Sequence, residues 1–253
     1  MKILFYAFLI ALQLLTRLPA PAFSKLDENE QNKAFGLSVV FYPLIGLIIG
    51  GILILLSDGL SHLALPSKGL IEAGILLAVW VLITGALHLD GLADSADAWL
   101  GGYGDKERTL AIMKDPYSGP AAVVIIVLIL LLKFSGLTVA EPQILLLAPV
   151  LARTAIMILL ATTPYVRAGG MGETAVNNLP KIAVWFVVLL VLIFAVTLLG
   201  EYSAGLLVLL GIGYLLRRHM LKRINGTTGD TAGAMLEVME VATLLVFIIL
   251  YSV

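Results

Sequence analysis

Long apolar runs separated by short polar segments dominate the chain. Seven are candidates for membrane-spanning helices, at residues 36–56, 73–89, 119–140, 143–166, 182–200, 202–216 and 234–253. A helix needs about 20 mostly apolar residues to cross the hydrocarbon core of a bilayer, so the 15-residue run at 202–216 is marginal. The runs lack the alternation of apolar and polar residues that membrane β-strands show. The pattern therefore predicts an all-α fold, a polytopic transmembrane helical bundle with about seven spans.

An additional apolar run at residues 3–15 is too short to cross a bilayer and has two interpretations. Lys2 before the run and the Ala20-Pro21-Ala22 segment after it are typical of a secretory signal peptide. Arg17, however, lies where a cleavage region is normally neutral, and prolines flank the small residue Ala20. We therefore favour a short N-terminal interfacial or re-entrant helix.

Composition excludes several classes of protein. Of 253 residues, 60% are hydrophobic and only 13% are charged, with a mean hydropathy of +1.04. A soluble domain is about 45–50% apolar and about 25% charged, so a soluble globular enzyme, a disordered chain and a nucleic-acid binder are all excluded. The chain has no cysteine, which excludes disulfide scaffolds and thiol chemistry. Because no repeat or compositional boundary divides it, we predict a single integral membrane domain over residues 1–253.

The distribution of lysine and arginine predicts the orientation in the membrane. With seven spans and a cytoplasmic N-terminus, 13 of the 16 basic residues fall in cytoplasmic segments. Lys68 and Lys133 fall in outer loops, and Arg153 falls within a span. Cytoplasmic loops carry the excess of positive charge in membrane proteins. The long polar connections are therefore expected on the cytoplasmic side.

The most informative polar segment follows the 73–89 run. It reads HLDGLADSADA at residues 88–98, and Asp90, Asp94 and Asp97 point within about 60° of one another on a helix. Like charges at this spacing destabilise a helix, so a positive partner is expected. Carboxylate oxygens suit Mg²⁺, Mn²⁺ or Ca²⁺, and Mg²⁺ commonly accompanies a phosphate-bearing substrate. The alternative is a solvated acidic turn that ends a span; the pattern of a calcium-binding loop is absent.

The loop at 101–119 and an intramembrane arginine add candidate cations. Arg108 and Lys114 are suited to phosphate oxygens, and Asp115 to metal binding or proton abstraction; the alternative is a salt-bridged amphipathic linker. Arg153 lies among apolar residues, where an arginine costs roughly 2.5–3.5 kcal/mol. We favour a role for Arg153 as counter-charge to a bound diphosphate, with snorkelling or an ion pair to a span carboxylate as alternatives.

A second acidic face opens the last apolar run. Asp230, Glu237 and Glu240 lie within about 80° on one helix face, and Thr228 or Asp230 is a plausible N-cap. A second carboxylate cluster facing the first would hold one or two cations between two helices. Thr227 and Thr228 precede the helix, a natural seat for an anion. The basic residues before them are expected to set orientation and meet anionic lipid, with Arg223 the candidate exception: Arg217, Arg218, Lys222 and Arg223.

Taken together, four segments resemble the cobalamin synthase family of adenosylcobinamide-GDP ribazoletransferases. They are LTRLPAP at 15–21, the acidic segment 88–98, residues 107–119 and TGDTAGAMLEVME at 228–240, in the family's order. The resemblance implies an integral enzyme of the bacterial inner membrane that requires Mg²⁺. The distribution of Lys and Arg predicts that its acidic segments face the cytoplasm. The resemblance also implies the reaction: α-ribazole or its 5′-phosphate joins adenosylcobinamide-GDP, releasing GMP and giving adenosylcobalamin or its 5′-phosphate. This is the last assembly step of the cobalamin nucleotide loop.

The residue-based interpretation supplies roles for that reaction. The predicted metal ligands are Asp90, Asp94, Asp97, Asp230, Glu237 and Glu240. The residues predicted to bind substrate are Arg108, Lys114, Arg153, Arg223, Thr227 and Thr228. The predicted catalytic residues are Arg108, Lys114 and Arg153, which would offset phosphoryl charge, and Asp97 or Asp115 as proton acceptor. Membrane lipid is an expected partner, nucleic acid is not, and a homo-oligomer is left open.

Two other functions remain alternatives. A CDP-alcohol phosphatidyltransferase also joins an alcohol to a nucleotide-linked phosphate at a membrane, but its motif carries arginine at the position of Asp94 and aspartate at the position of Thr109. A cation-coupled transporter would use intramembrane carboxylates and Arg153 as an ion path. That class would predict inverted repeats, which the sequence lacks.

Overall fold

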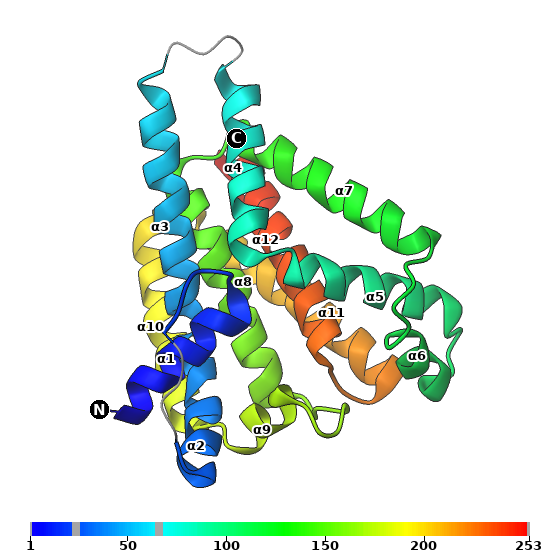
Figure 1. The fold of residues 1–253 in the computed structure, drawn as a ribbon. Coiled ribbons are helices and arrows are strands. Elements are labelled where there is room, and N and C mark those ends of the chain that lie inside the picture. Colours follow the sequence, from blue (N-terminus) through cyan, green and yellow to red (C-terminus); the bar gives the residue numbers. More distant parts are fainter. Residues whose placement is uncertain (1, 22–25, 64–67, 252–253) are drawn as a thin grey trace.

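The computed structural model describes residues 2–21, 26–63 and 68–251. These residues form a bundle of helices (Figure 1), and no strand is present in the described ranges. The helices are α1 Lys2–Leu15, α2 Glu28–Ser38, α3 Tyr42–Ser61, α4 Lys68–Thr84, α5 Leu87–Gly101, α6 Lys106–Ile112, α7 Pro120–Leu137, α8 Pro142–Thr162, α9 Met171–Asn177, α10 Lys181–Leu199, α11 Gly205–Ile224 and α12 Gly229–Tyr251, with short 3₁₀ turns η1 Val39–Phe41 and η2 Gly200–Ala204. The predicted all-α fold is confirmed.

Within the described residues, five helical segments are long and apolar enough to cross a membrane, or up to six if α4 and α5 are counted as one bent span. The protein is therefore a multi-pass membrane protein. The number of spans agrees roughly with the seven apolar runs. The runs at 182–200 and 202–216 lie in one helical segment, Lys181–Ile224, because the 3₁₀ turn η2 joins α10 directly to α11.

The predicted run at 73–89 is not one straight helix. It breaks after Thr84, and α5 leaves the direction of α4 by 85°. Gly85 and Ala86 both have positive φ, at 62° and 56°, which ends α4 and starts α5 in a new direction. The backbone N–H of Arg17 donates to Ile83 O at 2.7 Å at the same place. The bend carries α5 across the bundle instead of along α4 (Figure 1).

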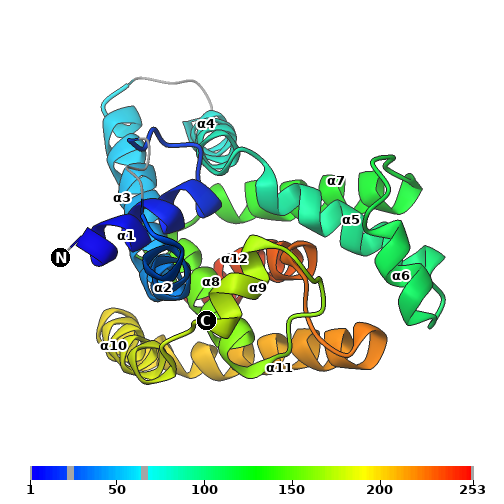
Figure 2. The same ribbon diagram turned by 60° about the horizontal axis from the view of Figure 1, so that its bottom comes forward.

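The most buried long helix is α8, which lies at the centre of the bundle (Figure 2) and packs against α3, α10 and α12. Its contact with α3 is close: Cβ atoms added at Gly46 and Gly50 would lie 2.6 and 2.8 Å from the backbone of α8. The outer helix α10 is mostly exposed, as expected for a lipid-facing helix.

The short N-terminal helix agrees with the predicted one in type and length. Helix α1 has 14 residues and buries Tyr6, Ile10 and Leu15 among others. It packs on α2 and lies beside α3 (Figure 1). It is an apolar helix below spanning length.

Candidate active site

Helices α5 and α12 cross in close backbone contact, and this crossing organises the acidic residues. A Cβ atom added at Gly91 of α5 would lie 2.8 Å from Asp230 O of α12. One turn away, a Cβ at Gly233 would lie 3.3 Å from His88 Cα. At Gly91 only glycine allows this approach, whereas a side chain at Gly233 would be a tight contact. Gly91, which directly follows Asp90, therefore allows α12 to approach the face of α5 that carries Asp90 and Asp94.

The crossing gathers carboxylates from both helices. Asp90 is exposed, whereas Asp94 and Asp230 are partly buried. Helix α5 lies outside the five spanning segments. Partial burial there and, to a smaller extent, the negative charges of Asp90 and Asp230 raise the pKa of Asp94 from 3.8 to about 6. The like charges that the sequence pattern predicted to share a face do lie close enough to repel one another. Helix α12 contributes Asp230 to this group.

Asp97 has a structural partner of its own. Its Oδ2 accepts a hydrogen bond from the Gly119 N–H at 2.5 Å, and its Oδ1 accepts one from the Ala122 N–H at 3.1 Å. These N–H groups belong to the first turn of α7, which has no intrahelical acceptors for them. Asp97 therefore caps α7 from the neighbouring helix α5, and both its oxygens are engaged.

Arg167 is the positive partner that the sequence analysis did not assign to the site. Its Nη1 lies 3.1 Å from Asp230 Oδ2, and its Nη2 donates to Met113 O at 3.4 Å. The loop that carries Arg167 pairs with the residues before α12: Val166 N–H donates to Thr227 O, and Thr227 N–H donates to Pro164 O, at 2.9 and 2.8 Å. This pairing joins residues about 60 positions apart, so no local pattern could reveal it.

The start of α12 is capped as the sequence predicted. Thr228 Oγ1 accepts a hydrogen bond from the Thr231 N–H at 3.2 Å, and the Thr231 hydroxyl accepts one from the Thr228 N–H at 2.9 Å. Thr228, and not Asp230, is therefore the N-cap. Thr227 and Thr228 are both fully buried, and both hydroxyls contact Thr231. The structure thus places these threonines beneath the site and not on its surface.

Glu237 and Glu240 lie deeper along α12, apart from the aspartates. Lys133 Nζ lies 2.7 Å from Glu237 Oε2 and 2.6 Å from Glu240 Oε2, and Arg153 Nη1 lies 2.7 Å from Glu240 Oε1. All four side chains are at most 3% exposed. Of the alternatives for Arg153, the structure shows the ion pair with a span carboxylate. Lys133 was predicted in an outer loop; it lies buried in α7, because two carboxylates of α12 compensate its charge.

The buried ion cluster formed by Lys133, Arg153, Glu237 and Glu240 is neutral overall, but some buried polar atoms in and beside it make no hydrogen bond to the part of the chain that the structure describes. Trp80 places its ring 4.6 Å from Lys133 Nζ, a cation–π contact. Arg153 Nε and Nη2 and His88 Nδ1 have no hydrogen-bond partner among the described residues. The cluster joins α7, α8 and α12 in the middle of the bundle.

The predicted residues of the 101–119 loop are all at the surface. Arg108 is exposed on the short helix α6, and Lys114 and Asp115 are exposed after it. Asp115 Oδ1 accepts the Tyr117 N–H at 3.1 Å. All three side chains are accessible to solvent, and Arg167, which pairs with Asp230, also donates to Met113 O beside Lys114.

Two of the three arginines of α11 that were considered for lipid or substrate make protein contacts, Arg217 and Arg223. Arg223 donates to Trp99 O at the end of α5, and its guanidinium lies 5.8 Å from the Trp99 ring. Arg217 donates to Thr163 Oγ1 at 3.0 Å and to Thr162 O at 2.6 Å. Arg217 therefore caps the C-terminus of α8, a favourable place for a cation, which adds a structural role to the lipid contact expected for it.

The carboxylates fit a magnesium ion that is bound together with a phosphate ligand. Within the described ranges, no three acidic or histidine side chains form a ready metal cage. Mg²⁺ usually retains several waters and binds through one or two carboxylates plus substrate phosphates. Asp90 and Asp94 offer accessible oxygens, and the buried Asp230 Oδ2 accepts no hydrogen bond from the described residues. Arg167 meets this oxygen as a charge contact only.

The fold and the site define a class: a multi-pass helical membrane protein with a carboxylate-rich site at the crossing of two helices. Comparison with known sequences identifies the family. The chain belongs to the cobalamin-5-phosphate synthase family, whose model matches residues 7–248. It is thus a transferase of cobalamin synthesis, as the resemblance of its motifs implied.

Its relatives cover nearly the whole chain. An adenosylcobinamide-GDP ribazoletransferase of Pseudomonas fluorescens is 50% identical over 244 residues, which are 94% of this chain and 97% of the relative. Proteins of the same name from Stutzerimonas stutzeri and Pseudomonas entomophila are also 50% identical, over 93% and 94% of this chain and 95% and 96% of theirs. No solved structure matches the chain significantly.

Proposed function

We propose that the protein joins α-ribazole, or its 5′-phosphate, to adenosylcobinamide-GDP. The reaction releases GMP and gives adenosylcobalamin or its 5′-phosphate. The names of the relatives support these substrates. The observation that carries the proposal is the gathering of Asp90, Asp94 and Asp230 where α5 crosses α12. Such a group of carboxylates binds a divalent cation, and the diphosphate of a GDP-linked substrate provides the remaining oxygens.

In this proposal the carboxylates at the crossing would hold Mg²⁺, which would offset charge on the diphosphate. Asp94 and Asp90 are the first candidates as ligands, and Asp230 supports them from α12. The predicted further ligands Glu237 and Glu240 do not bind the metal in this proposal. Their ion pairs with Lys133 and Arg153 hold α12 in position.

The cations around the crossing complete the phosphate site. Arg108 and Lys114 are exposed and bind phosphate oxygens, Arg by a two-pronged contact and Lys as a point charge. Arg167 holds Asp230 and adds a positive charge beside it. Asp97 positions the start of α7, because both its oxygens are engaged there. Asp115 is the freer candidate for accepting the proton of the attacking ribose hydroxyl.

We place this site at the cytoplasmic face of the bacterial inner membrane. The excess of Lys and Arg in the polar connections supports the orientation. The nucleotide-linked substrate and GMP are soluble in the cytoplasm, so an inward-facing site needs no transport of either.

The test is incubation of the purified protein with adenosylcobinamide-GDP, α-ribazole and Mg²⁺, followed by chromatography of the products. Release of GMP together with a new corrinoid is expected, and addition of EDTA should stop both. Phosphatidyl transfer from a CDP-linked lipid to an alcohol would instead support the lipid-enzyme alternative. Cation flux into proteoliposomes without any GMP release would support a transporter and overturn the proposal.

A further inference from the structure

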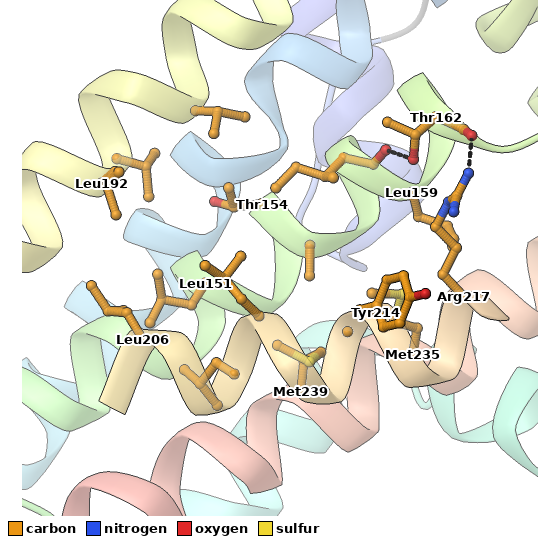
Figure 3. Close-up of a pocket in the computed structure, with 17 residues that line it drawn as sticks. Leu151, Thr154, Leu159, Thr162, Leu192, Leu206, Tyr214, Arg217, Met235 and Met239 are labelled. Atoms are coloured by element: carbon orange, nitrogen blue, oxygen red, sulfur yellow. Dashed lines mark hydrogen bonds between the residues drawn. The ribbon is translucent and has the colours of Figure 1, made fainter. Parts of the chain in front are cut away.

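A cavity lies on the other side of α12 from the acidic site. It has a volume of about 490 Å³ and lies between α8, α10, α11 and α12 (Figure 3). Small-molecule sites commonly have volumes of about 300–1,000 Å³. The lining is almost entirely apolar, with Leu151, Leu192, Leu206, Met235 and Met239 among its residues.

This cavity does not belong to the acidic site. Met235 and Met239 follow Asp230 on α12 by five and nine residues, which places them about 140° and 180° around the helix from it. The cavity and the carboxylates therefore use opposite faces of α12. The ligand of the cavity must be apolar where it meets these methionines and leucines.

The length of the cavity matches one leaflet of a bilayer. Its lining runs along α11 from Leu206 to Arg217, about 16 Å at the helical rise per residue. Half of a hydrocarbon core is about 15 Å. The outer faces of α10 and α11 expose large apolar side chains, including Phe186, Ile193 and Leu207. The cavity thus lies among the lipid-facing helices of the protein.

The end of the cavity at Arg217 is basic. Arg217 lines the cavity at this end, and two further cations of α11, Arg218 and Lys222, follow one and five residues beyond it. Both are exposed. The opposite end, at Leu192 and Leu206, has no charged residue in its lining. An apolar cavity with cations at one end only is complementary to an acyl chain that carries an anionic headgroup.

We propose that this cavity binds one acyl chain of an anionic phospholipid, whose phosphate contacts Arg218 and Lys222. The proposal is independent of the transfer reaction, since it rests on α8, α10, α11 and the far face of α12. Arg217, already engaged with Thr162 and Thr163, lines the basic end of the cavity.

Native mass spectrometry of the protein from vesicles of equimolar phosphatidylglycerol and phosphatidylcholine tests the proposal. We expect one retained phospholipid, with phosphatidylglycerol in excess. Ala155 lines the cavity, so the larger side chain of Ala155→Trp should fill it. This variant should lose the retained lipid. Leu207→Trp, on the exposed face of α11, is the matched control and should retain it.

The headgroup contact has a separate test that leaves the packing unchanged. Arg218→Gln with Lys222→Gln should lower the preference for phosphatidylglycerol by about fivefold for each charge removed, while one lipid is still retained. Lys33→Gln, at an exposed position of α2, should leave the preference unchanged. Equal retention of the two lipids by the unsubstituted protein, or undiminished lipid in Ala155→Trp, would overturn the proposal.

Discussion

Charge at single positions distinguishes two groups of acidic residues in this protein. Asp90, Asp94 and Asp230 lie together with Arg167 as the only cation paired to them in the described residues. Glu237 and Glu240 lie with two cations that compensate them. An under-compensated group can bind a further cation, whereas a neutral group gains nothing from one. The first group is therefore the one that we propose as the metal site, and the second stabilises the packing of α12.

Asp94→Asn tests the metal-binding role at the residue scale. The amide is almost the same size and removes one of the repelling charges, so the protein should remain folded and inserted. We expect GMP release to fall about a hundredfold or more, because a lost metal contact commonly costs at least this much. Asp58→Asn, at an exposed position of α3, is the control and should keep full activity. Full activity of Asp94→Asn in the presence of EDTA would refute the metal role.

The buried ion cluster gives a prediction about stability. Arg153→Met leaves one uncompensated negative charge in the cluster, so the free energy of unfolding should fall by about 3–5 kcal/mol. Arg153→Met combined with Glu240→Gln restores neutrality around Lys133 and Glu237 and should recover more than half of that loss. Arg218→Gln, exposed on α11, should change stability by about 0.5 kcal/mol or less. Thermal unfolding in detergent measures all three; a double variant less stable than Arg153→Met would contradict the ion-pair interpretation.

At the scale of elements, the site depends on how closely α5 and α12 approach. The bend at Gly85 and Ala86 turns α5 across the bundle, and Gly91 then allows α12 to touch it. Asp97 attaches α7 to the far end of α5, and Arg223 attaches α11 there through Trp99. The helix that carries the predicted metal ligands is thus held at both ends and at its middle.

Gly91→Ala tests the crossing. The new Cβ would lie 2.8 Å from Asp230 O, and since this atom is backbone, the helices must move apart. We expect activity to fall by about ten- to a hundredfold, as displacements near 1 Å in an active site commonly do. In Gly51→Ala the added Cβ meets nothing within 4 Å, so this variant should keep its activity and gain up to about 1 kcal/mol of stability. Equal activity of the two variants would show that close approach of α5 and α12 is not required.

At the scale of the whole molecule, α12 connects three regions with different environments. Its first turn carries Asp230 at the site, its middle carries Glu237 and Glu240 in the ion cluster, and its other face lines the apolar cavity with Met235 and Met239. The helix is 23 residues long and packs against α5, α7, α8 and α11. A ligand in the cavity and a substrate at the site therefore contact the same rigid element.

The predicted orientation is testable because the chain contains no cysteine. Single cysteines at Glu107 and Asp58, both exposed, should report opposite sides of the membrane. In spheroplasts, a membrane-impermeant maleimide should label Asp58→Cys and should reach Glu107→Cys only after lysis. Labelling of Glu107→Cys in intact spheroplasts would place the acidic site outside and contradict a cytoplasmic enzyme.

Local pattern was sufficient for the features that depend on neighbours along the chain. The apolar runs predicted the helices, because a buried backbone in lipid must form its own hydrogen bonds. The 3.6-residue period predicted that Asp90 and Asp94 share a face, and the residues around 228 predicted the Thr228 cap. Motif order predicted the family, which the comparison confirmed.

Contacts between distant segments could only be decided by the tertiary structure. Lys133 meets Glu237 across 104 positions, and Arg167 meets Asp230 across a loop that pairs with Thr227. The sequence determined that α12 has an acidic face. The packing of α7, α8 and the 163–170 loop against α12 decides which of its carboxylates are paired with a cation. The free energy of a buried charge is set by its neighbours in space, and those neighbours are defined only when the helices are assembled.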